Sequence, residues 1–363
     1  VTLITAVLFG LIAGVWHWLG PINGKFGLLG AYRTFVEEIN QHGGWEIIGA
    51  GIVTGLVLAP GARRYWLRRL RELSTMRQVG TLACSGLLVL LIPHPDRLSG
   101  VVVMWLFFGL WFALNPLTKV LQQLAAAIAG YGLISYAFTI LKASIFLRGV
   151  SWDPELMAMD EWLFGQMAHR WVQDWAGQDR AFFQAAETIY LNLFSFMLAN
   201  AVLCAVMSGR EGVAAYGRAL VMVYVVGIVG YALFPAWGPF ISDAARMAQS
   251  PWSEGSWRIV GIQSVIKGNT QAVLNHHLDF GRIPPYAFVA AMPSLHMAIP
   301  SLGLFLFRGR PGFQLITLVF CLLTVYSTLL TGMHYGVDLL AGIFIAWIAC
   351  LGIAVPRIEM TRE

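Results

Sequence analysis

Residues 313–332 read FQLITLVFCLLTVYSTLLTG and contain no charged side chain. This stretch has the length of about 20 residues that a helix needs to cross a bilayer. Similar apolar runs recur along the 363-residue chain, which is 58% hydrophobic and 12% charged, whereas soluble domains carry about 25% charged residues. We therefore expect an all-α polytopic membrane protein, because a helix satisfies its own backbone hydrogen bonds in lipid.

About ten segments are candidate transmembrane helices by their length. They are residues 2–20, 45–61, 80–93, 99–118, 122–147, 186–208, 214–236, 291–307, 313–332 and 335–355. The first segment has no basic start and no small-residue cleavage site, so we expect a retained helix rather than a signal peptide. Residues 1–120 are expected to be accessory helices, and residues 121–363 are expected to form the core.

Basic residues indicate which ends of these helices face the cytoplasm, because short cytoplasmic loops carry an excess of them. The loop after the second span has one acid, Glu72, and six arginines: Arg63, Arg64, Arg68, Arg69, Arg71 and Arg77. With an even number of spans, both termini are cytoplasmic. We expect an inner or plasma membrane location, with an active site on the extracytoplasmic (periplasmic) face. The net charge of +5 reflects this topology and gives no reason to expect nucleic acid.

Two polar segments, 148–185 and 238–290, are expected to be outer loops. The first combines tryptophans with acids, which suits an amphipathic helix or a lid over a lipid site, with packing in the aromatic belt as the simpler alternative. The second leads into the histidine motif described next. All four cysteines, Cys84, Cys204, Cys321 and Cys350, fall in apolar spans without metal-site spacing, so we interpret them as core residues.

Two short motifs near the C-terminus carry the chemistry that we expect. Residues 291–296 read AMPSLH, and Pro293 suits the first turn of a helix whose free amides would attract an anion near Ser294 and His296. Residues 331–338 read TGMHYGVD, and the four-residue spacing predicts that His334 and Asp338 lie on one helical face, so that Asp338 holds one nitrogen of His334. Ser327, seven residues before His334, is expected on the same face. By the expected topology both histidines lie at the same outer membrane face.

With these motifs, the chain resembles the type 2 phosphatidic acid phosphatase superfamily over roughly its last six spans. Members of that family combine a Pro-Ser-x-His motif with a later Ser-Arg-x5-His-x3-Asp motif. The matching residues here are Pro293, Ser294 and His296, then Ser327, Thr328, His334 and Asp338. The resemblance implies a helical core of six spans that contains a phosphatase or phosphotransferase site.

The resemblance also implies a role for each residue. His334 would attack phosphorus to form a phosphohistidine, Asp338 would orient it, and His296 would act as general acid and then general base. Ser294 and Ser327 would bind the phosphoryl oxygens, and Tyr335 would contribute to substrate binding. No metal and no cofactor are implied.

Two departures remove the cations of the family's phosphate clamp. The family arginine is replaced by Thr328, and the upstream Lys-x6-Arg-Pro motif has no evident counterpart. A phosphoryl transition state needs positive charge, so we expect cations of the outer loop to substitute. The candidates are Arg246, Arg258, Lys267 and Arg282, with Arg282 preferred because it is closest in sequence to His296.

The motif variants look most like the branch that contains inositol phosphorylceramide synthase and its bacterial relatives. This likeness favours a headgroup phosphotransferase acting on a lipid or polyprenyl phosphate, although hydrolysis differs only in the acceptor. A lipid-phosphate transporter or flippase without catalysis is the alternative. A metal site at His276, His277 and Asp279 is less favoured, because adjacent helical side chains point in different directions. The expected partners are the substrate, membrane lipids and a second copy bound through the N-terminal helices.

Overall fold

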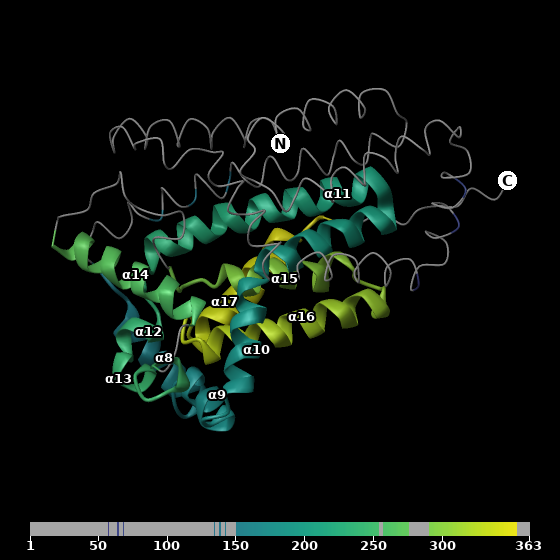
Figure 1. Ribbon diagram of the computed structural model, residues 1–363. Coiled ribbons are helices and arrows are strands. Elements are labelled where there is room, and N and C mark those ends of the chain that lie inside the picture. The colour runs from purple at the N-terminus through teal and green to yellow at the C-terminus, as the bar shows by residue number, and fades with distance from the viewer. Residues whose placement is uncertain are drawn as a thin grey trace, which may run out of the picture. The chain divides into compact units, whose positions relative to one another are not determined.

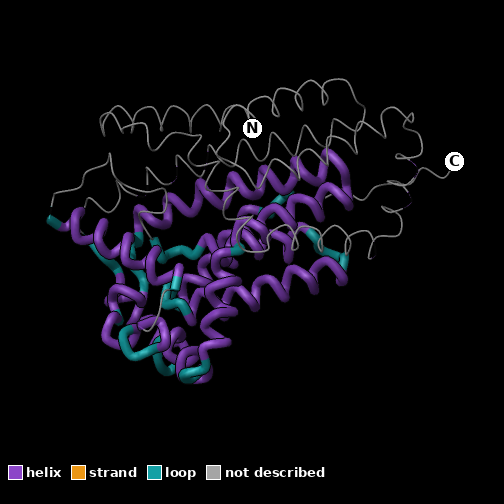
Figure 2. Tube along the Cα trace, in the orientation of Figure 1, coloured by secondary structure: helices purple, strands orange, loops and turns teal. Residues whose placement is uncertain are grey.

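The structure is a computed structural model that describes residues 150–253, 257–275 and 290–353, together with the helical positions Val57, Arg64, Arg68, Ile134, Phe138 and Lys142. The elements in these ranges are helices, and the ranges contain no strand (Figure 1; Figure 2). The expectation of a mostly helical fold is therefore confirmed. The spans 2–20, 80–93 and 99–118 and the boundary at residue 120 lie outside the described residues. Spans 45–61 and 122–147 are described only at single positions.

The chain divides into two compact units. One unit comprises Val1–Tyr32, Tyr131–Leu193 and Arg218–Ile353, and the other comprises Arg33–Gly130, Phe194–Gly217 and Ala354–Glu363. Both histidine motifs belong to the first unit, so the candidate site is contained in one compact body.

Helices occupy the described parts of the two polar segments that were expected to be outer loops. The first segment contains α8 (Asp153–Phe164), α9 (Ala168–Ala176) and the start of α10 (Arg180–Leu191). The second contains α12 (Pro239–Ser242), α13 (Ala244–Met247), a 3-10 helix (Pro251–Ser253) and α14 (Arg258–Leu274). The described part of the long loop is thus mostly helical.

Between these segments, α11 (Leu193–Leu233) contains a reversal of the chain. Ser208 and Gly209 have non-helical backbone angles, and the φ of 55° at Gly209 lies in the left-handed region that glycine tolerates. The Tyr216 hydroxyl donates to the Met197 carbonyl at 3.0 Å across 19 residues, a separation of about 28 Å in a continuous helix. The reversal falls between the predicted spans 186–208 and 214–236.

Three apolar helices follow the second polar segment: α15 (Leu295–Leu306), α16 (Pro311–Leu330) and α17 (Gly336–Ala349). They lie side by side in Figure 1, and they occupy most of the predicted spans 291–307, 313–332 and 335–355. By length and composition, two helical stretches in the described part of the chain are long and apolar enough to cross a membrane, Pro311–Leu330 and Ser195–Leu233, of which the second contains the reversal at Ser208 and Gly209, whereas α15 and α17 are shorter.

Close backbone approaches hold the first histidine motif in place. A Cβ at Gly342 of α17 would lie 2.4 Å from the Ser294 carbonyl oxygen, and a Cβ at Gly230 of α11 would lie 2.5 Å from the Pro293 ring. Glycine at these two positions therefore allows α17 and α11 to pack directly against the segment that precedes α15.

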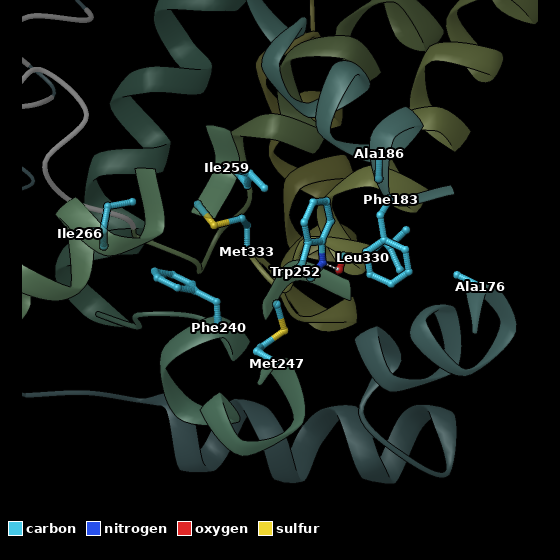
Figure 3. Packing of buried hydrophobic residues seen from close by; sticks show 10 residues of the cluster. All are labelled: Ala176, Phe183, Ala186, Phe240, Met247, Trp252, Ile259, Ile266, Leu330 and Met333. Carbon is cyan, nitrogen blue, oxygen red and sulfur yellow. Dashed lines mark hydrogen bonds between the residues drawn. The ribbon is translucent and has the colours of Figure 1, made fainter. Parts of the chain in front are cut away.

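A cluster of buried apolar side chains anchors the polar segments to the end of α16 (Figure 3). Its members are Ala176, Phe183, Ala186, Phe240, Met247, Trp252, Ile259, Ile266, Leu330 and Met333. The Trp252 indole N–H also donates to the Leu330 carbonyl at 2.9 Å. Because Met333 precedes His334 directly, this cluster fixes one end of the loop that carries the second motif.

Candidate active site

His334 lies in the loop between α16 and α17, and its side chain is almost fully buried. Its Nδ1 is 3.1 Å from the Ala291 carbonyl oxygen. A carbonyl can only accept a hydrogen bond, so Nδ1 carries a proton and the Nε2 of neutral His334 has a free lone pair. That Nε2 is 3.2 Å from His296 Nδ1, so the two imidazoles meet directly.

Asp338 approaches His334 through the cap of α17 and not along one helical face. Helix α17 begins at Gly336, so His334 precedes the helix, and the Asp338 Oδ2 accepts the Tyr335 N–H at 2.9 Å. The same oxygen lies 3.5 Å from His334 Nδ1. A capping turn, rather than a shared helical face, therefore brings the two residues together.

Two other residues of the motifs are also placed differently from the expectation. Ser327 belongs to α16, a different helix from Asp338, and its hydroxyl donates to the Thr324 carbonyl at 3.1 Å. Pro293 precedes α15, and Ser294 is the N-cap whose oxygen accepts the Met297 N–H at 3.2 Å. The backbone N–H of Ser294 donates to the Asp338 carbonyl at 3.1 Å, which joins the two motifs.

Aromatic and basic side chains surround His296. Its imidazole stacks on the Tyr190 ring with centroids 4.5 Å apart and planes inclined by 21°. Lys142 is close enough for its charge to act on His296, and its Nζ lies 5.3 Å from the Phe138 ring centroid. The ring centroids of Phe138 and Tyr231 are 5.4 Å apart. Lys142 is thus a described cation whose charge acts on His296.

Asp160 of α8 caps two helices, α9 and α17, with one fully buried carboxylate. Its Oδ1 accepts the Val337 N–H at 2.8 Å. Its Oδ2 accepts the N–H groups of Gly336 and Ala168, each at 3.0 Å. Asp160 thus ties the first turn of α17, immediately after His334, to the first turn of α9.

Asp153, at the start of α8, holds the same loop through Tyr335. Its Oδ1 accepts the Tyr335 hydroxyl at 2.6 Å and the Gly238 N–H at 2.8 Å. Its Oδ2 accepts the Trp237 N–H at 2.8 Å. The Tyr335 oxygen also lies 2.6 Å from the Ser242 hydroxyl. Tyr335 is fully buried, so the structure places this residue in the support of the loop, whereas the sequence suggested substrate contact.

Comparison with protein families identifies this arrangement. Residues 154–352 match the family model of the PAP2 superfamily, that is, the type 2 phosphatidic acid phosphatases. The chain belongs to the PAP2 superfamily. The matched residues include both histidine motifs and Asp160, and they span α8 to α17 apart from the first residue of α8. Comparison with the curated proteins and with the solved structures gives no significant match.

PAP2 membership supports a phosphatase-type phosphoesterase with a helical membrane fold. The two helical stretches of sufficient length and the family membership both indicate a membrane protein. The likeness to the inositol phosphorylceramide synthase branch stays a prediction.

The cations suggested from the sequence are not gathered around the histidines in the part that the structure describes. Arg246 pairs with Asp174, and its Nε donates to Gln173 at 3.3 Å. Lys267 is exposed and lies 5.7 Å from the Phe240 ring centroid. Arg258 is the exposed first residue of α14, and Arg282 lies outside the described residues, as do His276, His277 and Asp279.

Sequence reasoning missed Lys142, although a signal for it was present. It is the single charged residue of the predicted span 122–147. An ionisable side chain in a membrane span is costly and marks a functional site by default. The buried acids Asp153 and Asp160 had no such signal, because a loop rich in acids and tryptophans is also typical of an exposed interface.

The described residues contain no group of three histidine, cysteine or acidic side chains placed to hold a metal ion. Cys204 and Cys321 are buried in apolar helices, Cys350 is buried at the C-cap of α17, and Cys84 lies outside the described residues. The ionisable side chains that the described part brings together at the two motifs are His296, His334 and Asp338.

Proposed function

We propose that this PAP2 protein is a metal-independent lipid phosphotransferase or phosphohydrolase that forms a phosphohistidine on His334, with headgroup transfer as the main reaction. The observation that supports this proposal most directly is the 3.2 Å contact between His334 Nε2 and His296 Nδ1. It pairs a nucleophilic nitrogen with a proton donor, while Ala291 and Asp338 fix the other nitrogen of His334.

In the first step, the Nε2 lone pair of His334 attacks phosphorus, and the bond between phosphorus and the leaving ester oxygen breaks. His296, which enters this step as the imidazolium, gives one proton to that oxygen and becomes neutral. In the second step, His296 takes a proton from an alcohol or water whose oxygen attacks phosphorus, and the electron pair of the phosphorus–nitrogen bond returns to His334. With a phosphodiester substrate, an alcohol acceptor gives a new phosphodiester and water gives a phosphomonoester. With a phosphomonoester substrate, an alcohol gives a new monoester and water gives inorganic phosphate.

The resting geometry requires one movement. A phosphoryl group does not fit between two nitrogens that are 3.2 Å apart, so the imidazoles must separate when the substrate binds. Lys142, whose charge acts on His296, is the described cation that we assign to compensating the phosphoryl charge. The Asp338 carboxylate, 3.5 Å from His334 Nδ1, stabilises the positive charge that phosphorylation leaves on the His334 ring.

The proposal is tested by phosphate release and headgroup exchange from a panel of lipid and polyprenyl phosphates, with a metal chelator present. Purified wild type should be active, and His334→Ala should be inactive and should form no acid-labile phosphoprotein. Exchange without release identifies a transferase. Activity that persists in His334→Ala contradicts the phosphohistidine, and activity abolished by the chelator contradicts metal independence.

A paired substitution tests the cation. We expect Lys142→Met to reduce kcat by about 10²-fold, because it removes positive charge from the phosphoryl group. Arg308→Met is the matched control, since Arg308 is exposed in the turn after α15, at the opposite end of that helix from His296. Equal activities of the two variants would remove Lys142 from the proposed site.

A lipid-phosphate transporter is the alternative, favoured by one observation. Thr328 replaces the PAP2 arginine, and its buried hydroxyl donates to the Thr324 carbonyl at 2.6 Å, so this position adds no positive charge. Proteoliposomes that move a fluorescent lipid phosphate between leaflets equally with wild type and His334→Ala, without any product, would support this alternative.

A further inference from the structure

Helix α9 has an inverted distribution of side chains. It buries His169 and Gln173 together with Ala168 and Ala176, while Trp171 and Trp175 are 57% and 66% exposed. A helix that faces water turns its apolar side inward and its polar side outward. The exposed side of α9 presents two indole rings beside the exposed Asp174, which pairs with Arg246, so this side is suited to the boundary between an apolar and an aqueous surrounding.

The buried polar face of α9 is satisfied mainly by the protein itself. His169 Nε2 lies 2.9 Å from Asp243 Oδ2, and Arg170 binds the same carboxylate at 2.8 and 3.0 Å. The Gln173 amide donates to the Leu330 carbonyl at 3.4 Å. These contacts fix the rotation of α9 about its axis, so the outward direction of its tryptophans is set by the fold.

The tryptophans continue into a connected aromatic surface. We name it the aromatic edge, and it consists of Phe164, Trp171, Trp175, Phe182 and Tyr326. The Trp171 indole donates to the Phe164 carbonyl at 3.1 Å. Trp175 lies 4.8 Å from the Phe182 ring and 6.2 Å from the Tyr326 ring between centroids. The Tyr326 hydroxyl donates to the Phe182 carbonyl at 2.6 Å.

Tyr326 joins this edge to the exposed apolar face of α16. That helix exposes side chains at helical spacing up to four residues before Tyr326: Leu315, Leu318, Val319 and Leu322. Since α16 has the length and composition of a membrane span, this face is suited to contact acyl chains. The aromatic edge continues this exposed face of α16 past Leu322, beside α9 and α10 (Figure 1).

We propose that the aromatic edge binds the interfacial layer of the bilayer, at the level of the lipid headgroups and upper acyl chains. Tryptophan and tyrosine favour this layer because their rings are apolar and their N–H and O–H groups find polar partners there. The edge then places the membrane surface near the C-terminal end of α16, which is also where the His334 loop begins. A lipid headgroup at this level is within the reach of the histidine pair.

The proposal is tested with nitroxide labels on the full chain in lipid nanodiscs, without substrate, so that the result is independent of catalysis. The four native cysteines are first replaced by alanine. Single cysteines are then placed at Trp171 and Trp175, at Leu322 as the lipid control and at Asp174 as the polar control on the same helix. We expect the ratio of oxygen to water-soluble nickel collisions to be severalfold higher at 171 and 175 than at 174, and to approach the ratio at 322.

Two outcomes overturn the proposal. Labels at 171 and 175 that the nickel complex reaches as readily as at 174 would place the edge in water. Labels shielded from both reagents and broadened by a second label would place it between two copies. If a tryptophan variant fails to fold, Phe182→Cys gives the same reading. A measurement without labels compares the quenching of tryptophan fluorescence by brominated lipids in the wild type and in the double variant Trp171→Phe/Trp175→Phe. If the two tryptophans contact lipid, the wild type should be quenched more strongly.

Discussion

The loop that carries His334 is held differently on its two sides. On the α15 side, its partners are the Ala291 carbonyl and the His296 imidazole, at 3.1 and 3.2 Å. On the α8 side, its partners are the carboxylates of Asp153 and Asp160, which bind a hydroxyl and backbone amides. In the proposed reaction the His296 contact must open and exchange a proton, whereas every contact on the α8 side can persist. The comparison separates reactive groups from groups that only position the loop.

The largest effect is expected on the reactive side. We expect His296→Gln to lower kcat by about 10²- to 10⁴-fold for an alkyl ester, because the leaving oxygen loses its general acid. For a lipid analogue with a nitrophenyl leaving group, the loss in the first step should be much smaller, since that group leaves without a proton. The rate of phosphohistidine formation with the two substrates measures this difference. Equal losses with both would mean that His296 does not protonate the leaving group.

On the carboxylate side, we expect Asp160→Asn to act through position and stability. The amide keeps one accepting oxygen for three backbone donors, so unsatisfied N–H groups should lower the free energy of unfolding by about 1–3 kcal/mol. The kcat should fall as the first turn of α17 loosens. Unlike in His296→Gln, the loss should be the same for alkyl and nitrophenyl substrates. A loss that depended on the leaving group would assign Asp160 to the chemistry and break the comparison.

Tyr335→Phe sharpens the comparison further, because the sequence and the structure suggest different roles for Tyr335. Asp153 would keep the Trp237 and Gly238 amides, so the free energy of unfolding should fall by only about 0.5–1.5 kcal/mol. KM should stay unchanged, because the hydroxyl is engaged by Asp153 and Ser242. A raised KM with unchanged stability would restore the substrate contact that the motif suggested.

The two sides also differ in how far the sequence predicts them. Pro293, Ser294 and His296, and then His334 and Asp338, form local patterns, and the apolar runs around them become α15, α16 and α17. Two of the three partners of Asp160 are backbone amides 176 and 177 residues away, and a backbone amide has no sequence signature. Sequence reasoning therefore assigned this acid to an interface.

The candidate cations could not be placed from the sequence for a related reason. Closeness in sequence does not decide which charges pair, since Arg246 meets Asp174 across 72 residues. The preference for Arg282 stays a prediction, because this residue lies outside the described residues. Lys142, in contrast, could be predicted from sequence, since a single charge in an apolar span needs a functional reason. The sequence shows that the segment of α9 is rich in tryptophan, but it does not show which side of the helix faces outward. Only the contacts of His169 and Gln173 in the structure fix that side.

The smallest effect is expected farther from the loop, at His169 and Asp243. Burial lowers the pKa of His169 below its ordinary value, although Asp243 opposes the shift. The unfolded chain therefore takes up a proton below pH about 6.5 that folded His169 resists, so the free energy of unfolding should decrease as the pH falls from about 7 to 5. Burial would raise the pKa of Asp243, but Arg170 and His169 hold it below its ordinary value, so that contribution is lost only at more acidic pH. Chemical denaturation across this range should give a flatter profile for His169→Gln, whereas parallel profiles would show that His169 does not titrate differently on unfolding.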